Sequence, residues 1–405
     1  MNAPSLPHQR IAFVSTRDLT QPNGRTQIMG PVIRSLRRHH RVDIITLRSV
    51  MQTRKPCDAA GVLLAWGKSL LRGKPLPLQC LLYASPFEAR RLAEHIRRES
   101  YDVVYLDTVR CQILLRALRR VAPDIHVVSD FDDLMSRRAA FLSRNGLPFL
   151  SGHVGPHLPG WLRWLIEVPL ARLITAYEAF TLPAAEDEVV RNSDVTVLLS
   201  PIEQRMLELR TNIAVTAIAP PVPLEAPAWH TAESLRFVFI GSDRQLQNRT
   251  AIDRLLDHWR TLAPTTELHI YGHQFRPLAE IPGVVWHGFV EDLAEVYTPG
   301  SIAVVPAVVA GGIKTKVAEA WAWGCPVLGN EIAFEGLRIE TYPLNVPADE
   351  WAPLLTNPGR YGGLWVRAAR LGSDFVRDSL APARSERAWE RVVMPAMSSL
   401  SQTLG

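Results

Sequence analysis

Short apolar runs alternate with helical patterns along the 405 residues, and this alternation constrains the fold more than any other feature. In the first half, the runs that are typical of strands are Ile11–Ser15, Val42–Leu47, Val103–Asp107, Ile125–Asp130 and Val195–Ser200. In the second half they are Phe237–Gly241, Leu268–Gly272, Val284–His287, Ile302–Pro306 and Val327–Gly329. Helical patterns, such as residues 25–40 and 86–99, lie between them. Alternation of this kind predicts an α/β fold with parallel sheets and crossover helices.

A proline-rich stretch at residues 219–229 separates the two halves and is typical of a semi-rigid linker. We therefore predict a first Rossmann-like domain over residues 1–218, a linker over 219–232, a second Rossmann-like domain over 233–380 and a helical segment over 381–405. Ligands bind at the carboxyl ends of the strands in such sheets, so a cleft between the two domains is the expected site.

The stretch 310–337, AGGIKTKVAEAWAWGCPVLGNEIAFEGL, carries the densest chemical signal. Gly311 and Gly312 allow close approach of the backbone to a ligand. Lys314 and Lys316 stand near a helix start, where cations are unfavourable unless an anion is nearby. Glu319 is a lone acid among apolar residues, and its burial would be costly without hydrogen-bond donors. The segment predicts a site for a sugar ligand that carries phosphate.

Residues Gly311 to Val327 resemble the nucleotide-sugar site of GT-B glycosyltransferases, most closely that of glycosyltransferase family 4 (group 1). The family pattern is roughly G-G-x-x-x-K-x-x-E-A-x-A-x-G-x-P-V, and every fixed position matches here. Further resemblance lies at residues 22–26, 239–248, 268–272 and 287–293. One departure is clear, because the first of two glutamates that many members carry falls on Gly311. The resemblance implies the GT-B fold, two Rossmann-like domains with a cleft between them, and a last helix that crosses back to the first domain.

The resemblance also implies roles for individual residues. Lys316 would stabilise the leaving diphosphate, and Glu319 would accept hydrogen bonds from the nucleotide ribose. Lys314 and Arg244 would lie near the diphosphate, although both could equally be solvated surface cations. The other positions expected to approach the donor are Gly311, Gly312, Gly241, Gly272, Val290, Asn23 and Gly24. Of these, Asn23 and Gly24 belong to a loop expected after the first strand.

An acidic segment, Ser129 to Asp133, ends the strand predicted at residues 125–130. Asp130 and Asp133 are candidate catalytic groups that would hold an acceptor hydroxyl, because catalytic side chains gather at this end of a parallel strand. They could equally cap the next helix, which is a common role for aspartate. We predict no metal site, because GT-B enzymes generally need no bound divalent ion.

These features predict a glycosyltransferase that moves a sugar from a nucleotide-sugar donor, a UDP- or GDP-sugar first, with no permanently bound cofactor. The expected acceptor is a cell-surface polysaccharide or a polyprenyl-diphosphate-linked glycan, and the family implies retention of configuration. Two alternatives stay open: a GT-B nucleotide-sugar epimerase or hydrolase, and a non-catalytic nucleotide-sugar-binding subunit of a glycan assembly complex. A Rossmann oxidoreductase is disfavoured, because the first strand is followed by Ser15 to Asp18 and not by G-x-G-x-x-G.

Charge is unevenly distributed along the chain. Residues 1–215 hold 29 Lys and Arg against 20 Asp and Glu, and residues 216–405 hold 16 against 20. A basic first half fits an anionic membrane surface or a phosphate-bearing acceptor, and it equally fits solvated arginine-rich helices. Nucleic acid is not a predicted partner, because no recognisable module accompanies the charge.

Two segments, residues 61–78 and 159–174, combine Leu and Trp with basic residues. Each fits either an interfacial membrane helix or an amphipathic helix that faces the core. No apolar run approaches the ~20 residues of a membrane span, and the amino terminus lacks an apolar signal core, so we expect the cytoplasm or the inner face of the membrane. Four cysteines, at positions 57, 80, 111 and 325, lack metal spacing and are expected to be small buried hydrophobes.

Overall fold

The computed structural model describes residues 8–17, 19, 24–53, 55–147, 170–226, 234–339 and 341–394. Contacts divide these residues into two compact units. The first unit holds the described residues up to Ala140, those of Ala176–Pro221 and those from Pro382 onward. The second holds the described residues of Phe141–Thr175 and Val222–Ala381. Asn23 and most of the segment 159–174 lie outside the described residues.

The first unit alternates strands and helices from its start. Its strands are β1 (Arg10–Ser15), β2 (Arg41–Thr46), β3 (Val103–Asp107), β4 (His126–Asp130), β5 (Val195–Leu198) and β6 (Thr216–Ala217). Its helices are α1 (Gly24–Leu36), α2 (Val50–Thr53), α3 (Pro56–Leu71), α4 (Leu78–Leu81), α5 (Pro86–Arg98), η1 (Val109–Cys111), α6 (Gln112–Val121), α10 (Pro201–Thr211) and α16 (Pro382–Val393). Two more helices, α7 (Met135–Arg144) and α9 (Ala171–Asn192), run across the boundary of the division.

The strands of the first unit form one parallel sheet in the order β2-β1-β3-β4-β5-β6. All five strands predicted for this half are present, with ends shifted by one or two residues. They were recognisable because the core strands β1 and β3 are buried along almost their whole length and read as continuous apolar runs. The two-residue strand β6 was missed, because it is too short to produce a pattern.

The second unit repeats the scheme with a second parallel sheet, in the order β11-β10-β7-β8-β9. Its strands are β7 (Arg236–Ile240), β8 (Leu268–Tyr271), β9 (Val284–Gly288), β10 (Ser301–Val305) and β11 (Val327–Gly329). Its helices are α11 (Leu246–Leu262), η3 (Leu293–Glu295), α12 (Thr315–Ala322), α13 (Glu331–Phe334), η4 (Ala348–Glu350), α14 (Ala352–Thr356), η5 (Pro358–Tyr361) and α15 (Gly362–Ser379). The predicted α/β architecture with parallel sheets is therefore confirmed in both halves.

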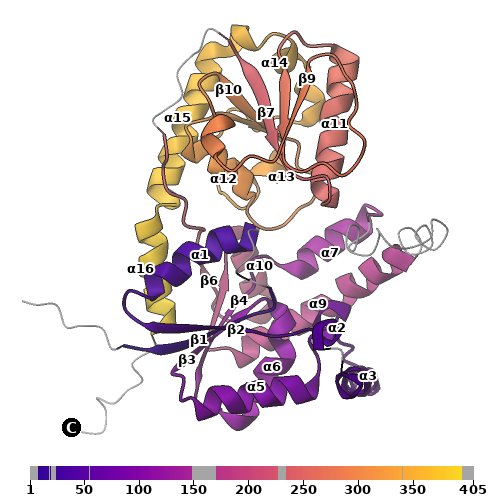
Figure 1. Ribbon diagram of the computed structural model, residues 1–405, viewed down its shortest axis with the longest axis vertical. Helices are drawn as coiled ribbons and strands as arrows, with labels where there is room; N and C mark the ends of the chain where they lie inside the picture. Colours follow the sequence, from indigo (N-terminus) through magenta and orange to yellow (C-terminus); the bar gives the residue numbers. More distant parts are fainter. Residues whose placement is uncertain are drawn as a thin grey trace, which may run out of the picture. The chain divides into compact units, whose positions relative to one another are not determined.

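Strand order locates the place where each sheet can bind a ligand. In the second sheet, the connection from β7 to β8 and the connection from β10 to β11 lead in opposite directions from neighbouring strands. Right-handed crossovers then put α11 and α12 on opposite faces, as Figure 1 shows. The carboxyl ends of β7 and β10 flank the switch point, where ligands bind in open α/β sheets. In the first sheet, the same reasoning places the switch point between β1 and β3.

The last helix, α16, packs in the first unit although the whole second unit precedes it in the sequence. It contacts α1 and β4, and Trp389 at its centre is buried with its ring 5.6 Å from that of Tyr105 on β3. Val392 and Val393 of the same helix are buried as well.

Two expectations about surface exposure need correction. Cys57 is exposed, whereas Cys80, Cys111 and Cys325 are buried as expected. In α3, the leucines lie largely in solvent, whereas Val62, Leu76 and Leu78 of the same segment pack in a core cluster. The interpretation of residues 61–78 as a core-facing helix therefore holds only in part. Among the described helices, none combines the length and the apolar character that crossing a bilayer requires.

Candidate functional site

Lys316 lies in α12 and reaches the switch point of the second sheet. Its ammonium donates to the carbonyl oxygen of Ile240, at the end of β7, over 3.0 Å, and to Oδ1 of Asn248 over 2.9 Å. The nitrogen also lies 4.5 Å from the centroid of the Phe239 ring. Burial lowers the pKa of Lys316 to about 8, partly opposed by the nearby Glu319 carboxylate. The charge is thus held in place by neutral acceptors and a ring face.

Glu319 follows Lys316 by three residues and so lies on the same side of α12. Burial raises the pKa of its carboxyl, and the Lys316 ammonium acts in the opposite direction. Within the part of the chain that the structure describes, no hydrogen bond reaches this carboxylate. A half-buried acid without donors is costly, so its environment is one that a ligand with hydroxyl groups would complete.

Two glycines keep the backbone at the switch point free of side chains. A Cβ at Gly241 would lie 2.8 Å from Cγ of Asn248 and would displace the partner of Lys316. A Cβ at Gly272 would lie 2.8 Å from the carbonyl oxygen of Gly241, and its φ of +114° also favours glycine. The amide of Gln274 donates to the carbonyl oxygens of both glycines over 3.0 Å each and joins the two loops.

The glycine turn before α12 is closed by a residue to which the sequence pattern assigned no role. The amide of Gly311 donates to Oε2 of Glu335 over 2.9 Å. Gly311 and Gly312 both have positive φ, at 105° and 66°. Lys314 is the N-cap residue of α12 and folds its ammonium back to the carbonyl oxygen of Gly311. The Gly311 amide therefore faces a carboxylate of the protein itself, and this contact holds the turn in shape.

The loops after β8 and β9 present aromatic side chains. His273 and Phe289 stack with ring centroids 4.9 Å apart and an interplanar angle of 6°. The guanidinium of Arg244 lies 5.6 Å from the ring centroid of Phe275, and the Arg244 side chain is exposed. Val290 follows Phe289 and is partly exposed. The sequence pattern predicted backbone contacts here and gave these rings no role.

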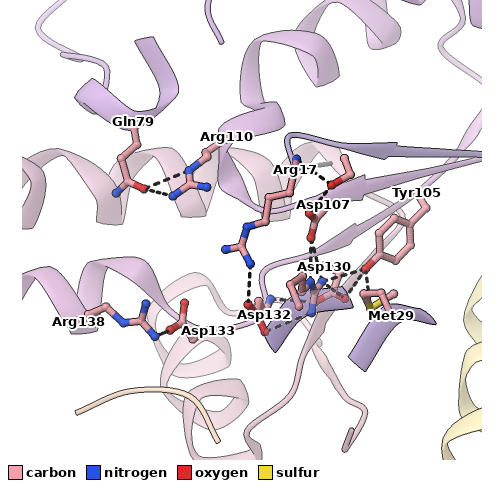
Figure 2. A network of polar contacts seen from close by, with 12 residues as sticks. Arg17, Met29, Gln79, Tyr105, Asp107, Arg110, Asp130, Asp132, Asp133 and Arg138 are labelled. Carbon is pink, nitrogen blue, oxygen red and sulfur yellow. Dashed lines mark hydrogen bonds and ion pairs between the residues drawn. The ribbon is translucent and has the colours of Figure 1, made fainter. Parts of the chain in front are cut away.

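Buried charges gather at the switch point of the first sheet, as Figure 2 shows. Asp107 ends β3 and Asp130 ends β4, and the two residues are paired in register. Arg25 donates from Nε to Asp107 over 3.0 Å and from Nη2 to Asp130 over 2.6 Å. The hydroxyl of Tyr105 also donates to Asp130, and Ser15 donates to Asp107 over 2.8 Å. These contacts account for both carboxylates, which are shielded from solvent.

Asp132 is the member of this cluster that reaches the surface. Its side chain is 23% exposed, whereas that of Asp130 is 0% exposed. Its backbone has a positive φ of 63°, and its amide donates to Oδ1 of Asp130 over 2.9 Å. One carboxylate oxygen accepts from Arg25 over 3.2 Å, and the other lies 4.0 Å from Nη1 of Arg17. Burial raises the pKa of Asp132, and the Arg25 guanidinium acts in the opposite direction.

Two cations lie beside this cluster: Arg17, whose nearest carboxylate among the described residues is that of Asp132, and Arg110. Arg17 follows β1 and is 34% exposed, and Figure 2 shows it extending toward Asp132. Arg110 in η1 donates twice to Oε1 of Gln79, over 3.1 and 2.8 Å. Burial lowers the pKa of Arg110, and the neighbouring charge of Arg17 lowers it further. A guanidinium held by a neutral amide keeps its charge available to an anion.

The structure also shows the surroundings of the other residues that the sequence predicted for the site in the first unit. Asp133 forms an ion pair with Arg138, so its carboxylate also has a structural partner. Gly24 is the first residue of α1 and does not lie in the expected loop. Arg25, the second residue of α1, turns inward to the buried acids. Among the described residues, no group of three or more His, Cys, Asp or Glu side chains is arranged to hold a metal ion.

The comparisons with known proteins bear on this geometry. Residues 234–349 match the family of glycosyl transferases group 1, a range that includes the loops after β7, β8, β9 and β10 and all of α12. No curated protein sequence matches the chain.

Several solved structures share the fold at low sequence identity. The crystal structure of Anabaena HepE in complex with UDP and glucose is 12% identical, with 95% of this chain and 99% of that chain covered and a TM-score of 0.61. A glycosyltransferase from Rickettsia africae is 10% identical, with 96% and 100% covered and a TM-score of 0.58. The calicheamicin glycosyltransferase CalG4 is 15% identical, with 96% and 98% covered and a TM-score of 0.52. The chain therefore has the GT-B fold of these structures, and its residues 234–349 match the glycosyl transferases group 1 family.

Proposed function

We propose that the protein transfers a sugar from a nucleoside-diphosphate donor, bound at the switch point of the second sheet, to an acceptor bound at the switch point of the first. The observation that carries the proposal is the pair formed by Lys316 and Glu319. On one side of α12 lie a half-buried cation held by neutral acceptors and a half-buried acid that accepts no hydrogen bond from the described residues. They complement a ligand that carries both phosphate and hydroxyl groups.

The donor side stabilises the leaving group. An ammonium has three N–H donors, and two of those of Lys316 go to Ile240 and Asn248. The third is left for a diphosphate oxygen, where negative charge grows as the glycosidic bond breaks. Glu319 would accept hydrogen bonds from the ribose diol, and Gly241 and Gly272 would let the backbone approach the nucleotide. We favour UDP, because the HepE structures hold UDP and UDP-glucose.

The acceptor side differs from the sequence prediction in one residue. We propose Asp132 as the group that orients the acceptor hydroxyl, because Asp130 and Asp133 already have buried or paired carboxylates. In a retaining transfer, the acceptor oxygen forms the new bond to the anomeric carbon while the bond to the donor phosphate breaks. The acceptor proton then passes to the leaving phosphate oxygen. Asp132 would position the hydroxyl in this scheme and would not need to keep the proton.

The cations beside Asp132 indicate the class of acceptor. Arg17 and Arg110 bring two guanidinium groups to the carboxyl ends of β1 and β3. We propose that they bind phosphate on the acceptor, as a polyprenyl-diphosphate-linked glycan would supply. An acceptor of this kind would place the protein at the inner face of the membrane during glycan synthesis, which agrees with the basic first half of the chain.

The donor is tested by saturation-transfer NMR with UDP-, GDP-, dTDP-, ADP- and CMP-sugars, and Glu319→Ala is the control variant. We expect one nucleotide to bind selectively and the variant to weaken its binding by roughly tenfold or more. No binding to any of them would contradict the proposal. A turnover assay then separates the alternatives. Release of free sugar or isomerised donor without acceptor would identify a hydrolase or epimerase, and binding without turnover would identify a non-catalytic subunit.

A further inference from the structure

Helix α3 packs on the first unit through its small and polar residues. Asp58 is buried and accepts a hydrogen bond from Ser85 over 2.6 Å, at the N-cap of α5. At Gly61, an added Cβ would lie 3.0 Å from Cδ of Pro86, so the missing side chain lets α5 approach closely. Ser69 is also buried, and its hydroxyl donates to the carbonyl oxygen of Trp66. The inward side of α3 thus contains an acid, a glycine and a serine, together with Val62, which packs against the core cluster of Leu76, Leu81 and Ala84.

The outward side of the same helix contains its large apolar residues. Leu63, Leu64, Leu70 and Leu71 are 66%, 63%, 45% and 89% exposed. Trp66 is also exposed, with its indole N–H 3.4 Å from the Tyr177 hydroxyl. An ordinary surface helix turns its leucines to the core and its polar residues to water, so α3 is inverted. Figure 1 shows α3 at the margin of the first unit. A contiguous exposed apolar surface of this kind marks an interaction site.

The charges around these leucines identify the partner. Lys55, Lys68, Arg72 and Lys74 are all exposed, and the only acid between residues 55 and 78 is the buried Asp58. The surface is therefore apolar and purely cationic. A symmetric dimer through the same face would bring like charges together, which disfavours a second copy as the occupant. Leucines and a tryptophan rimmed by Lys and Arg instead complement the headgroups and upper acyl chains of an anionic bilayer.

We propose that α3 is a membrane-docking helix, which lies in the plane of an anionic bilayer with its leucine side among the lipids. The inference extends the proposed function, because a docked first unit would meet a lipid-linked acceptor where that acceptor resides. It rests on α3 itself, however, and it is tested without donor or acceptor. Failure of vesicle binding would leave the proposed transfer standing, and failure of the transfer would leave docking standing.

Cys57 offers a reporter on the proposed docking side. It is the exposed cysteine of the four, and it precedes Leu64 and Leu71 by seven and fourteen residues, which places it on their stripe of the helix. The full-length protein, labelled at Cys57 with an environment-sensitive fluorophore, is mixed with vesicles of phosphatidylcholine alone or with phosphatidylglycerol. We expect co-sedimentation and a blue-shifted emission with the anionic vesicles only.

Three variants make the test specific. Leu64→Ser with Leu71→Ser should reduce binding to anionic vesicles by about tenfold or more, since both side chains would enter the lipid. Lys68→Glu with Arg72→Glu should reduce it similarly. Leu209→Ser on α10 is the matched control, because Leu209 is 69% exposed in the same unit, and it should bind like the unaltered protein. Absence of vesicle binding, equal loss in the Leu209 control, or a blue shift that follows protein concentration without vesicles would overturn the proposal.

Discussion

At the scale of single residues, the charge state of Lys316 sets the pH range of the proposed reaction. The ammonium must be protonated to stabilise the leaving diphosphate, and burial lowers its pKa to about 8. We therefore expect kcat/KM for the donor to fall about tenfold per pH unit above this value, since kcat/KM reports on the free enzyme. The fall in kcat should begin at a higher pH, because the bound diphosphate stabilises the protonated form of Lys316. A pH–rate profile from about pH 6 to 10 measures both.

Asn248 supplies the control for this assignment. Asn248→Asp and Asn248→Ala both lose the hydrogen bond from the Asn248 amide to Ser242, so their difference isolates the contact with Lys316. The carboxylate of the aspartate variant should raise the pKa of Lys316 and move the limb to higher pH. The alanine variant, which removes an acceptor, should move the limb to lower pH. Identical limbs in both variants would mean that another group titrates.

Asp132 and Asp130 should respond differently to the same change. Asp132→Asn should lower transfer by roughly 10²- to 10⁴-fold with donor binding unchanged, the range for loss of a positioned acid or base. Asp130→Asn should lower the free energy of unfolding by roughly 3–5 kcal/mol, because it leaves the buried Arg25 without one of its carboxylate partners. Steady-state kinetics and chemical denaturation of both variants measure the contrast. Equal loss of stability in the two variants would contradict the separate roles.

At the scale of helices and strands, the sequence was informative where one element carries its own signal. The buried strands β3 and β10 are continuous apolar runs, and the motif around α12 is contiguous, so both could be predicted. The role of Asp130, catalytic or structural, could not be predicted. Its partner Arg25 lies 105 residues away in the sequence, and the burial of Asp130 depends on this ion pair. Similarly, α3 has the composition of an ordinary amphipathic helix, and only the contact of Gly61 with α5 shows which side faces inward.

The packing of α12 against α15 fixes the element that carries Lys316 and Glu319. Trp321 is fully buried, and a Cβ at Gly372 would lie 2.2 Å from its indole ring. We expect Gly372→Ala to lower the free energy of unfolding by roughly 1–3 kcal/mol or more through overpacking. Gly363→Ala is the matched control in the same helix, because a Cβ added there would meet nothing within 4 Å. It should be neutral or stabilising by up to about 1 kcal/mol. Thermal unfolding compares the two variants. Equal effects would show that the close contact with Trp321 does not determine the stability of this packing.

At the scale of the whole molecule, the chain forms two compact units, each assembled from segments that are not contiguous in sequence. The first unit is completed by α16, which follows residues 222–381 of the second unit in the sequence. The sequence alone predicts a linker, because prolines interrupt the pattern there. That the last helix packs on the first domain was predicted from the family resemblance and not from the residues. The apolar side of α16 shows that the helix is buried, but it does not indicate which sheet the helix covers.

This arrangement predicts that the two units respond to different perturbations. Trp389 is buried against Tyr105 of the first unit, so Trp389→Ala should lower the stability of that unit by roughly 3–5 kcal/mol. A bound nucleotide should instead stabilise the second unit, and the stabilisation should increase with the affinity and concentration of the nucleotide. Differential scanning calorimetry of the full chain, with and without UDP, should then show one transition that only the variant lowers and one that only the nucleotide raises. A single transition that both perturbations shift would mean that the two sheets unfold together, and donor binding would then also stabilise the proposed acceptor site.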